Sequence, residues 1–485
     1  VKEHENGYVT YTTDLIPKYS GVHYYYFSYT SNGVRHYIKR GDACHGTLDQ
    51  GEMFQLTVYS EDYQTPQFLK GGVMYQIFPD RFCSSGKMHD NVPSDRVMRE
   101  WGELPYYKPD QNGHVWNNDY FGGDLDGIRS KLDYLKDLGV TCIYLNPIFE
   151  SHENHRYNTA NYRKVDPLLG TNEDFRELCK AAKTYGISVI LDGVFSHTGA
   201  DSIYFNKFGR YPTPGAYQSE KNPYYSWYHF WGNKEYESWW GIDTLPNVDE
   251  NNPSYTKYIC GDDGVLDYWL SLGAAGYRLD VADELPDEFL DNLRACVKKF
   301  DEEKIVIGEV WEDASNKEAY GVKRRYLLGD QLDSVMNYPL RCAVIDFFTG
   351  VIDAYQLRRV ILHQQEVYPA PFYYSLMNLL GSHDRVRILN ALCGLNREGA
   401  VQMDRAEAEK ITLGKRELKS AKKRYLEAMK LLCALPGAPT VYYGDEIGMT
   451  GMADPWNRAP MNWDEIGEHT SELQSPSYLV CRLLL

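Results

Sequence analysis

From residue 71 onward, short apolar segments alternate with stretches of helical periodicity, and this alternation restricts the fold more than any other feature. The pattern predicts strands at residues 72–78, 140–145, 187–191, 274–281, 304–309, 334–337, 374–380 and 439–443. It predicts helices at residues 125–138, 172–185, 262–272, 286–300, 351–366 and 404–434. Eight strands joined in this way indicate the α/β class and favour a closed (β/α)8 TIM barrel over an open doubly wound sheet.

The rest of the chain is divided around this barrel. Residues 1–70 contain strand-like segments rich in aromatic and β-branched residues, which predict a small N-terminal β domain, an incomplete sandwich. The barrel then occupies residues 71–198 and 256–485. Residues 199–255 follow the third strand and are too long for a simple loop, so we expect an inserted subdomain there. The signal for a last barrel helix before residue 485 is weak, and no C-terminal β domain is expected.

The amino-acid composition limits the kinds of partner that the chain is expected to bind. The net charge is −17 and no basic run is present, which argues against binding to nucleic acid or to an anionic membrane surface. No apolar window is long enough for a transmembrane helix. The 41 Tyr and 10 Trp suit contact with sugars or aromatic ligands, although packing explains them equally well. The 10 Cys are scattered without a C-x-x-C motif, so we expect reduced thiols and a cytoplasmic location, with secretion as the alternative.

Three predicted strands end in an acidic residue. These residues are Asp280, Glu309 and Asp384, and a barrel brings such strand ends to one rim. Two carboxyl groups are the minimum for glycoside hydrolysis, one ionised and one protonated. Arg278 lies two residues before Asp280, on the same strand face, and is expected to keep it ionised. Glu309 is flanked by Val310 and Trp311, which favours a raised pKa and the role of general acid. For any one of these acids, a loop cap or salt bridge is the alternative explanation.

Short motifs extend this constellation. They are Asp192-Gly-Val-Phe-Ser-His197, Gly276-Tyr-Arg-Leu-Asp280, Ile307-Gly-Glu-Val-Trp311 and Gly381-Ser-His-Asp384, with flanking motifs at residues 75–82, 121–125 and 437–446. In this order they resemble the α-amylase family (glycoside hydrolase family 13), over residues 71 to about 465. Residues 245–249 and 281–284 are similar to segments of its neopullulanase, cyclomaltodextrinase and maltogenic amylase group.

The resemblance implies roles for individual residues. Asp280 corresponds to the nucleophile, Glu309 to the acid/base and Asp384 to the transition-state stabiliser. The family retains anomeric configuration, which implies a covalent glucosyl–Asp280 intermediate and carboxyl groups about 5–5.5 Å apart. Residues implied to contact substrate, or to hold those that do, are Tyr157, Asp192, His197, Arg278, Glu284, Trp311 and His383.

The resemblance requires no cofactor and leaves a structural calcium ion as an option. Ser196 occupies a position where many members have a calcium-binding Asn, and a serine is a poor ligand for this ion. A second calcium site, known in the neopullulanase group, would use Asp90, Asn91, Gly122 and Asp124. Lys87 falls near a usual carboxylate position of that site, where its ammonium group is an alternative to the ion.

The sequence therefore predicts a retaining hydrolase of α-1,4-glucosidic bonds in maltooligosaccharides, cyclodextrins, starch or pullulan. The α-glucan is the expected partner, and some transglycosylation is expected. The alternatives are an α-1,6-active debranching enzyme, a general α-amylase, and a non-catalytic glycan-binding protein on the same barrel. A homodimer is left open, because in this group the N-terminal domain often completes a neighbour's active site.

Overall fold

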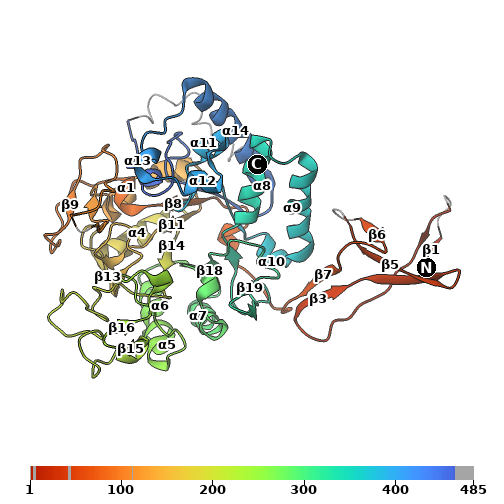
Figure 1. Cartoon of the computed structure of the whole chain (residues 1–485), viewed down its shortest axis with the longest axis horizontal. Coiled ribbons are helices and arrows are strands. Elements are labelled where there is room, and N and C mark those ends of the chain that lie inside the picture. The colour runs from red at the N-terminus through yellow and green to blue at the C-terminus, as the bar shows by residue number, and fades with distance from the viewer. Residues whose placement is uncertain (1, 4–6, 42–44, 112, 465–485) are drawn as a thin grey trace.

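A barrel of eight parallel strands forms the centre of the computed structural model, which describes residues 2–3, 7–41, 45–111 and 113–464 (Figure 1). The strands follow one another in the order β21-β18-β17-β14-β11-β8-β23-β22. A parallel bridge between Met336 and Met377 joins the two ends and closes the barrel. The predicted TIM barrel is confirmed, with strands β8 (Met74–Ile77), β11 (Cys142–Leu145), β14 (Ser188–Gly193), β17 (Gly276–Leu279), β18 (Ile305–Gly308), β21 (Ser334–Val335), β22 (Met377–Leu379) and β23 (Ala438–Tyr442).

Alternate residues of each strand face the barrel interior, as the pleat requires. Met74, Tyr144, Ile190 and Ile307 belong to one apolar cluster inside the barrel. Their strand neighbours instead join the larger cluster beneath the surrounding helices, as Tyr75, Ile143, Val189 and Val306 do. The strand ends at which acids were predicted continue the inward-facing register.

Helices surround the barrel. They are α1 (Pro79–Phe82), α2 (Leu125–Ser130), α3 (Leu132–Asp137), α4 (Asn172–Thr184), α5 (Pro253–Cys260), α6 (Val265–Ser271), α7 (Asp287–Phe300), α8 (Tyr338–Thr349), α9 (Ala354–Val367), α10 (Ala370–Tyr373), α11 (Ile388–Asn390), α12 (Glu398–Val401), α13 (Arg405–Ala408) and α14 (Lys415–Ala434). Two predicted helices are each broken in two, at residues 125–138 and 404–434. Helix α8 was not predicted, because apolar residues occupy almost its whole length and show no helical period.

Two segments leave the barrel between strands and helices. After β11 come the paired strands β12 (Phe149–Ser151) and β13 (Thr159–Val165). Residues 199–255 contain the small hairpin β15 (Phe230–Gly232) and β16 (Glu235–Tyr236), together with a short turn of helix at Trp239–Gly241. Further pairs are β9 (Val97–Met98) with β10 (Asp119–Tyr120), and β19 (Glu318–Ala319) with β20 (Val322–Lys323).

The N-terminal region is rich in β-structure and projects from the side of the barrel near α9 (Figure 1). Its sheets pair β3 (Gly21–Tyr25) with β7 (Phe54–Val58), and β4 (Phe27–Ser31) with β5 (Val34–Arg40) and β6 (Gly46–Leu48). Strand β1 (Lys2–Glu3) pairs with β2 (Val9–Thr10). Arg40 binds Glu366 of α9, which ties this region to the barrel. Its description as an incomplete sandwich stays a prediction, as do the domain boundaries.

The last predicted part of the barrel, residues 465–485, lies outside the described residues. Within the part that is described, no helix is both long and apolar enough to cross a membrane.

Candidate active site

The guanidinium group of Arg278 joins three carboxylates at the inward-facing ends of adjacent strands. Arg278 is fully buried on β17, and its Nη1 donates to Asp192 at 2.7 Å and to Asp280 at 2.9 Å. Its Nη2 lies 2.9 Å from Oε2 of Glu309, which follows β18. The short Arg278–Asp280 contact shows that the two side chains do leave the same strand face. Glu309 has no cation beside it in the sequence, and its cation comes instead from the neighbouring strand.

A glycine makes this close pairing of strands possible. Gly276 begins β17 with a φ of +141°, next to Ile305 of β18. A Cβ atom at this position would lie 2.0 Å from the carbonyl oxygen of Ile305. A larger residue would therefore push apart the two strands that carry Asp280 and Glu309.

The carboxyl groups outnumber the cation that binds them. Burial is the largest cause that raises the pKa of Asp280 and Glu309, and Arg278 opposes it in both. The charge of Asp384 raises both further. Both carboxyl groups therefore release their protons at a higher pH than a free carboxyl group does. Asp280 accepts a hydrogen bond from Arg278, whereas Oε2 of Glu309 lies against Nη2 without a hydrogen bond to it and accepts one from the backbone N–H of Val281 at 2.9 Å. The charge-assisted bond from Arg278 favours the charged form of Asp280.

Asp384 lies on the opposite side of the site with His383, after β22. Oδ2 of Asp384 is 3.1 Å from Nε2 of His383, and Oδ1 is 3.5 Å from Arg458. Burial, followed by the positive charge of Arg458, lowers the pKa of His383 well below its ordinary value. His383 is therefore neutral at neutral pH and can exchange hydrogen bonds with a hydroxyl group.

Tyr157 connects these two sides. Its hydroxyl donates to Asp192 at 2.8 Å and lies 2.5 Å from Nε2 of His383, and its ring stacks on the His383 ring with a 6° angle between planes. The backbone carbonyl of Tyr157 also lies 3.1 Å from Nε2 of His197. Burial lowers the pKa of His197 to about 4, so this ring is neutral too. The result is a flat, uncharged aromatic surface beside the carboxyl groups.

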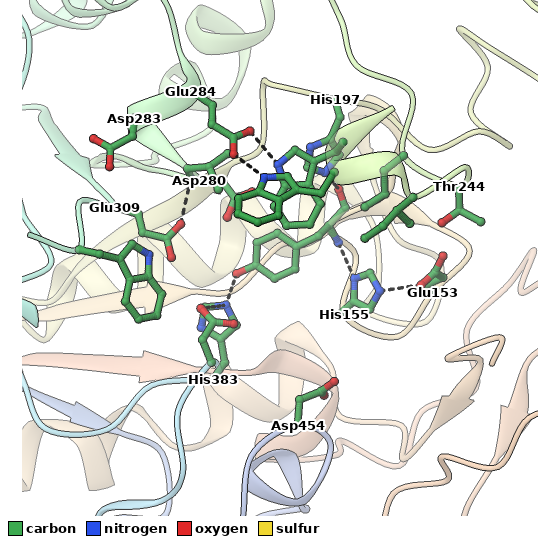
Figure 2. A pocket seen from close by; sticks show the side chains of 18 of the residues that line it. Glu153, His155, His197, Thr244, Asp280, Asp283, Glu284, Glu309, His383 and Asp454 are labelled. Carbon is green, nitrogen blue, oxygen red and sulfur yellow. Dashed lines mark hydrogen bonds and ion pairs between the residues drawn. The ribbon is translucent and has the colours of Figure 1, made fainter. Parts of the chain in front are cut away.

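A cavity of about 930 Å³ opens above these residues. Figure 2 shows Asp280, Glu309, His197 and His383 converging on it from different strand ends. Eight of the residues predicted from the sequence line the cavity, namely Tyr157, His197, Asp280, Glu284, Glu309, Trp311, His383 and Asp384. Arg278 and Asp192 lie beneath it, where they hold the lining residues in place.

The ring of Trp311, for which stacking on a sugar was predicted, packs on a protein side chain with one face. Its ring stacks on Tyr338 with 4.0 Å between centroids and a 3° angle between planes. The guanidinium of Arg385 lies 4.9 Å from the same ring centroid. Trp311 is 37 % exposed, so part of the ring still faces the cavity.

Several lining residues were not identified from the sequence. They include Trp239 and Trp240 of the inserted segment, Tyr320 of the β19–β20 turn, and Arg458 and Asp454 near the end of the described chain. All of them lie in loops far from the strand ends in sequence. The one available signal was the density of Trp and Tyr in residues 199–255.

The residues proposed for calcium do not fit that ion. Both carboxylate oxygens of Asp124 accept hydrogen bonds, from Ser85, His89 and the N–H of Gly127 in the first turn of α2. The ammonium of Lys87 contacts Asp126, and the N–H of Gly122 donates to Asp80. Asp90 and Asn91 are in the same loop. Among the described residues, no cluster of three or more His, Cys, Asp or Glu side chains is arranged to hold a metal ion. Lys87 and His89 supply the positive charge that this acidic turn requires.

Comparison with known proteins agrees with this geometry. The alpha-amylase catalytic domain family matches residues 76–475. The chain belongs to the alpha-amylase family. Curated relatives include an amylopullulanase of Thermoanaerobacter thermohydrosulfuricus, 40 % identical over 88 % of this chain and 31 % of its own. They also include neopullulanase 2 of Thermoactinomyces vulgaris, 33 % identical over 84 % of this chain and 61 % of its own.

Solved structures of this family have the same fold. The cyclic α-maltosyl-(1→6)-maltose hydrolase of Arthrobacter globiformis has a TM-score of 0.70 and 31 % identity, covering 86 % of this chain and 83 % of that chain. The type III pullulan hydrolase of Thermococcus kodakarensis has a TM-score of 0.72 and 27 % identity, covering 93 % and 76 %. The chain spans only about a third of the length of the amylopullulanases that it matches. The resemblance to the neopullulanase and cyclomaltodextrinase group is confirmed.

Proposed function

We propose that this chain hydrolyses α-1,4-glucosidic bonds of maltooligosaccharides and related α-glucans with retention of configuration. One observation carries the proposal. Asp280 and Glu309 end neighbouring strands and bind the same guanidinium group at the base of a large cavity. Two carboxyl groups held together, one charged and one protonated, are what a retaining glycosidase requires. The names of the curated relatives support an α-glucan as substrate.

The first step is displacement at the anomeric carbon. The Asp280 carboxylate attacks this carbon while Glu309 gives its proton to the glycosidic oxygen, so that the C–O bond to the leaving sugar breaks. Positive charge develops on the ring carbon and ring oxygen in the transition state. Asp384 faces this charge and stabilises it. The sugar is then esterified to Asp280, and Glu309 is ionised.

The second step releases the sugar. Glu309 now takes a proton from a water molecule, and the water oxygen attacks the anomeric carbon and displaces Asp280. Two inversions give net retention, and both carboxyl groups return to their initial states. A sugar hydroxyl in place of water would give transglycosylation. Throughout, Tyr157, His197 and His383 bind the sugar next to the cleaved bond, and Arg278 holds Asp280 in its charged form.

Two variants test this assignment. Asp280→Asn removes the nucleophile and Glu309→Gln removes the transferable proton, so each is expected to lower kcat on maltoheptaose by a factor of about 10³ or more, with starch binding retained. Proton NMR of fresh wild-type product is expected to show the α-anomer first. Initial release of the β-anomer, or wild type that binds starch without cleaving it, would contradict the proposal.

Three substrates test which type of glucosidic bond the wild-type protein cleaves. Product chromatograms on maltoheptaose, β-cyclodextrin and pullulan are expected to show maltose and glucose, with panose from pullulan if only α-1,4 bonds are cut. Maltotriose from pullulan would show cleavage of α-1,6 bonds and favour the debranching alternative.

We propose further that no cofactor is required, since each step above uses only carboxyl groups, and that activity will survive dialysis against EDTA. A cytoplasmic location is proposed on the basis of the cysteines, because the eight described are free thiols and five of them are buried.

A homodimer stays a proposal, and analytical ultracentrifugation of the chain will test it.

A further inference from the structure

The carboxylate of Glu284 is held by aromatic side chains. It follows β17 in a short turn of helix at Ala282–Glu284. Its Oε2 accepts a hydrogen bond from the indole nitrogen of Trp239 at 2.7 Å, and its Oε1 accepts one from that of Trp240 at 2.8 Å. Figure 2 shows Glu284 above Asp280 with both bonds drawn as dashed lines. Each carboxylate oxygen is therefore occupied by an indole N–H.

A third ring lines the same cavity from another segment. Tyr320 lies in the turn between β19 and β20. Trp239 and Trp240 belong to the inserted segment, so Glu284 connects that segment to the turn that follows β17. All three rings line the cavity.

Two of the three rings have strained backbones. Trp240 has a φ of +50° and Tyr320 a φ of +53°, both in the left-handed region that non-glycine residues rarely adopt. Burial of the side chain does not compensate for this strain, since Trp240 is 79 % and Tyr320 76 % exposed. Strained residues of this kind cluster at active sites and ligand clamps.

We propose that Glu284 is a positioning residue that holds Trp239 and Trp240, which together with Tyr320 form an aromatic collar that binds glucose units beyond those next to the cleaved bond. The collar thus selects longer α-glucans over short ones. This inference rests on the proposed function. Glucose rings present C–H faces that pack on aromatic rings, and the exposed ring faces of the collar fit this chemistry. The collar residues come from separate segments, and Glu284 accepts a hydrogen bond from each of the two tryptophans.

The test compares substrates of two lengths. Glu284→Gln keeps the size of the side chain but replaces one acceptor oxygen with an amide nitrogen, which donates and cannot accept a hydrogen bond from an indole N–H. The KM for maltoheptaose is expected to rise about tenfold, with kcat within about twofold of wild type and the KM for maltotriose little changed. Trp240→Ala is expected to give the same pattern. Trp240→Phe keeps a ring but loses the N–H, so its KM should lie between those of wild type and Trp240→Ala.

Matched controls separate the collar from general damage. Trp231 is also an exposed tryptophan of the inserted segment, at 60 %, and it does not line the cavity. Trp231→Phe is expected to leave both KM values unchanged. The double variant Glu284→Gln/Trp240→Ala should have about the same KM for maltoheptaose as either single variant, because the two residues act as one unit. An equal loss on maltoheptaose and maltotriose, or additive losses in the double variant, would overturn the collar.

Failure of the proposed hydrolytic activity would give a different result from failure of the collar. Wild type that cleaves neither substrate would refute hydrolysis, and calorimetric binding of maltoheptaose would then test the collar alone. About tenfold weaker binding by Glu284→Gln than by wild type would support it, whereas equal or absent binding would overturn it.

Discussion

Replacement of Arg278 by Met removes the cation that three buried acids share. Asp192 and Asp280 lie 2.7 and 2.9 Å from Nη1, and Glu309 lies 2.9 Å from Nη2. At an effective dielectric constant of about 20, opposite charges 4 Å apart interact by roughly 4 kcal/mol, or about three pKa units as an upper limit. Relaxation of the site will reduce this, so we expect the pKa of Asp280 to rise by about one to two units.

The assay is the pH dependence of kcat/KM on maltoheptaose. Asp280 acts in its ionised form, and Arg278 lowers its pKa, so loss of Arg278 moves the acid limb of the profile to higher pH. Unfolding is expected to become easier by about 3–5 kcal/mol, as for other broken buried ion pairs. Arg278→Lys keeps a positive charge but loses the two-armed guanidinium group. The acid limb of its profile should therefore shift less than that of Arg278→Met.

A second buried arginine provides the control. Arg294 binds Asp333 at 2.6 Å on the outer side of the barrel, away from the cavity lining. Arg294→Met is expected to destabilise the fold in urea without moving the acid limb. If Arg278→Met leaves the acid limb where it is in wild type, the idea that Arg278 keeps Asp280 ionised is refuted.

Two other changes have definite outcomes. Tyr157→Phe keeps the ring but removes the hydroxyl between Asp192 and His383, and kcat/KM on maltoheptaose should fall about tenfold; an unchanged value would show that the ring alone matters. Burial raises the pKa of Glu250 to about 8 from 4.5, so the folded state holds a proton that the unfolded state releases, and stability falls as pH rises from about 4.5 to 8. Thermal melts at pH 5 and pH 8 should differ less for Glu250→Gln than for wild type, and an equal difference would contradict the raised pKa.

The barrel was predictable because its signals are local. Each strand is a short apolar run, and an acid at its end faces inward by the same register that places Ile305 and Ile307 inside. The contacts between strands were not predictable. Nothing near Glu309 in the sequence indicates that Arg278 of the adjacent strand binds it, because that contact depends on strand order and stagger.

The rim of the cavity was the least predictable part. Glu284 lines the cavity, and its role toward sugar stays a prediction, but nothing in the sequence indicated that both of its oxygens bind indole groups of a distant segment. Arg458 and Tyr320 approach the cavity from loops whose paths follow no periodic pattern. Helix α8 was missed for a different reason, since an apolar helix packed on several sides has no polar face to mark its period.

The shortage of cations beneath the cavity has a consequence for inhibition. Asp192, Asp280, Glu309 and Asp384 together exceed the charge that Arg278 and Arg458 supply. A sugar-shaped ligand with a protonated ring nitrogen would bring the missing charge and let the acids release their protons. Such a compound should bind more tightly as pH rises, up to the pKa of its own nitrogen, while a neutral sugar of the same shape should show no such gain.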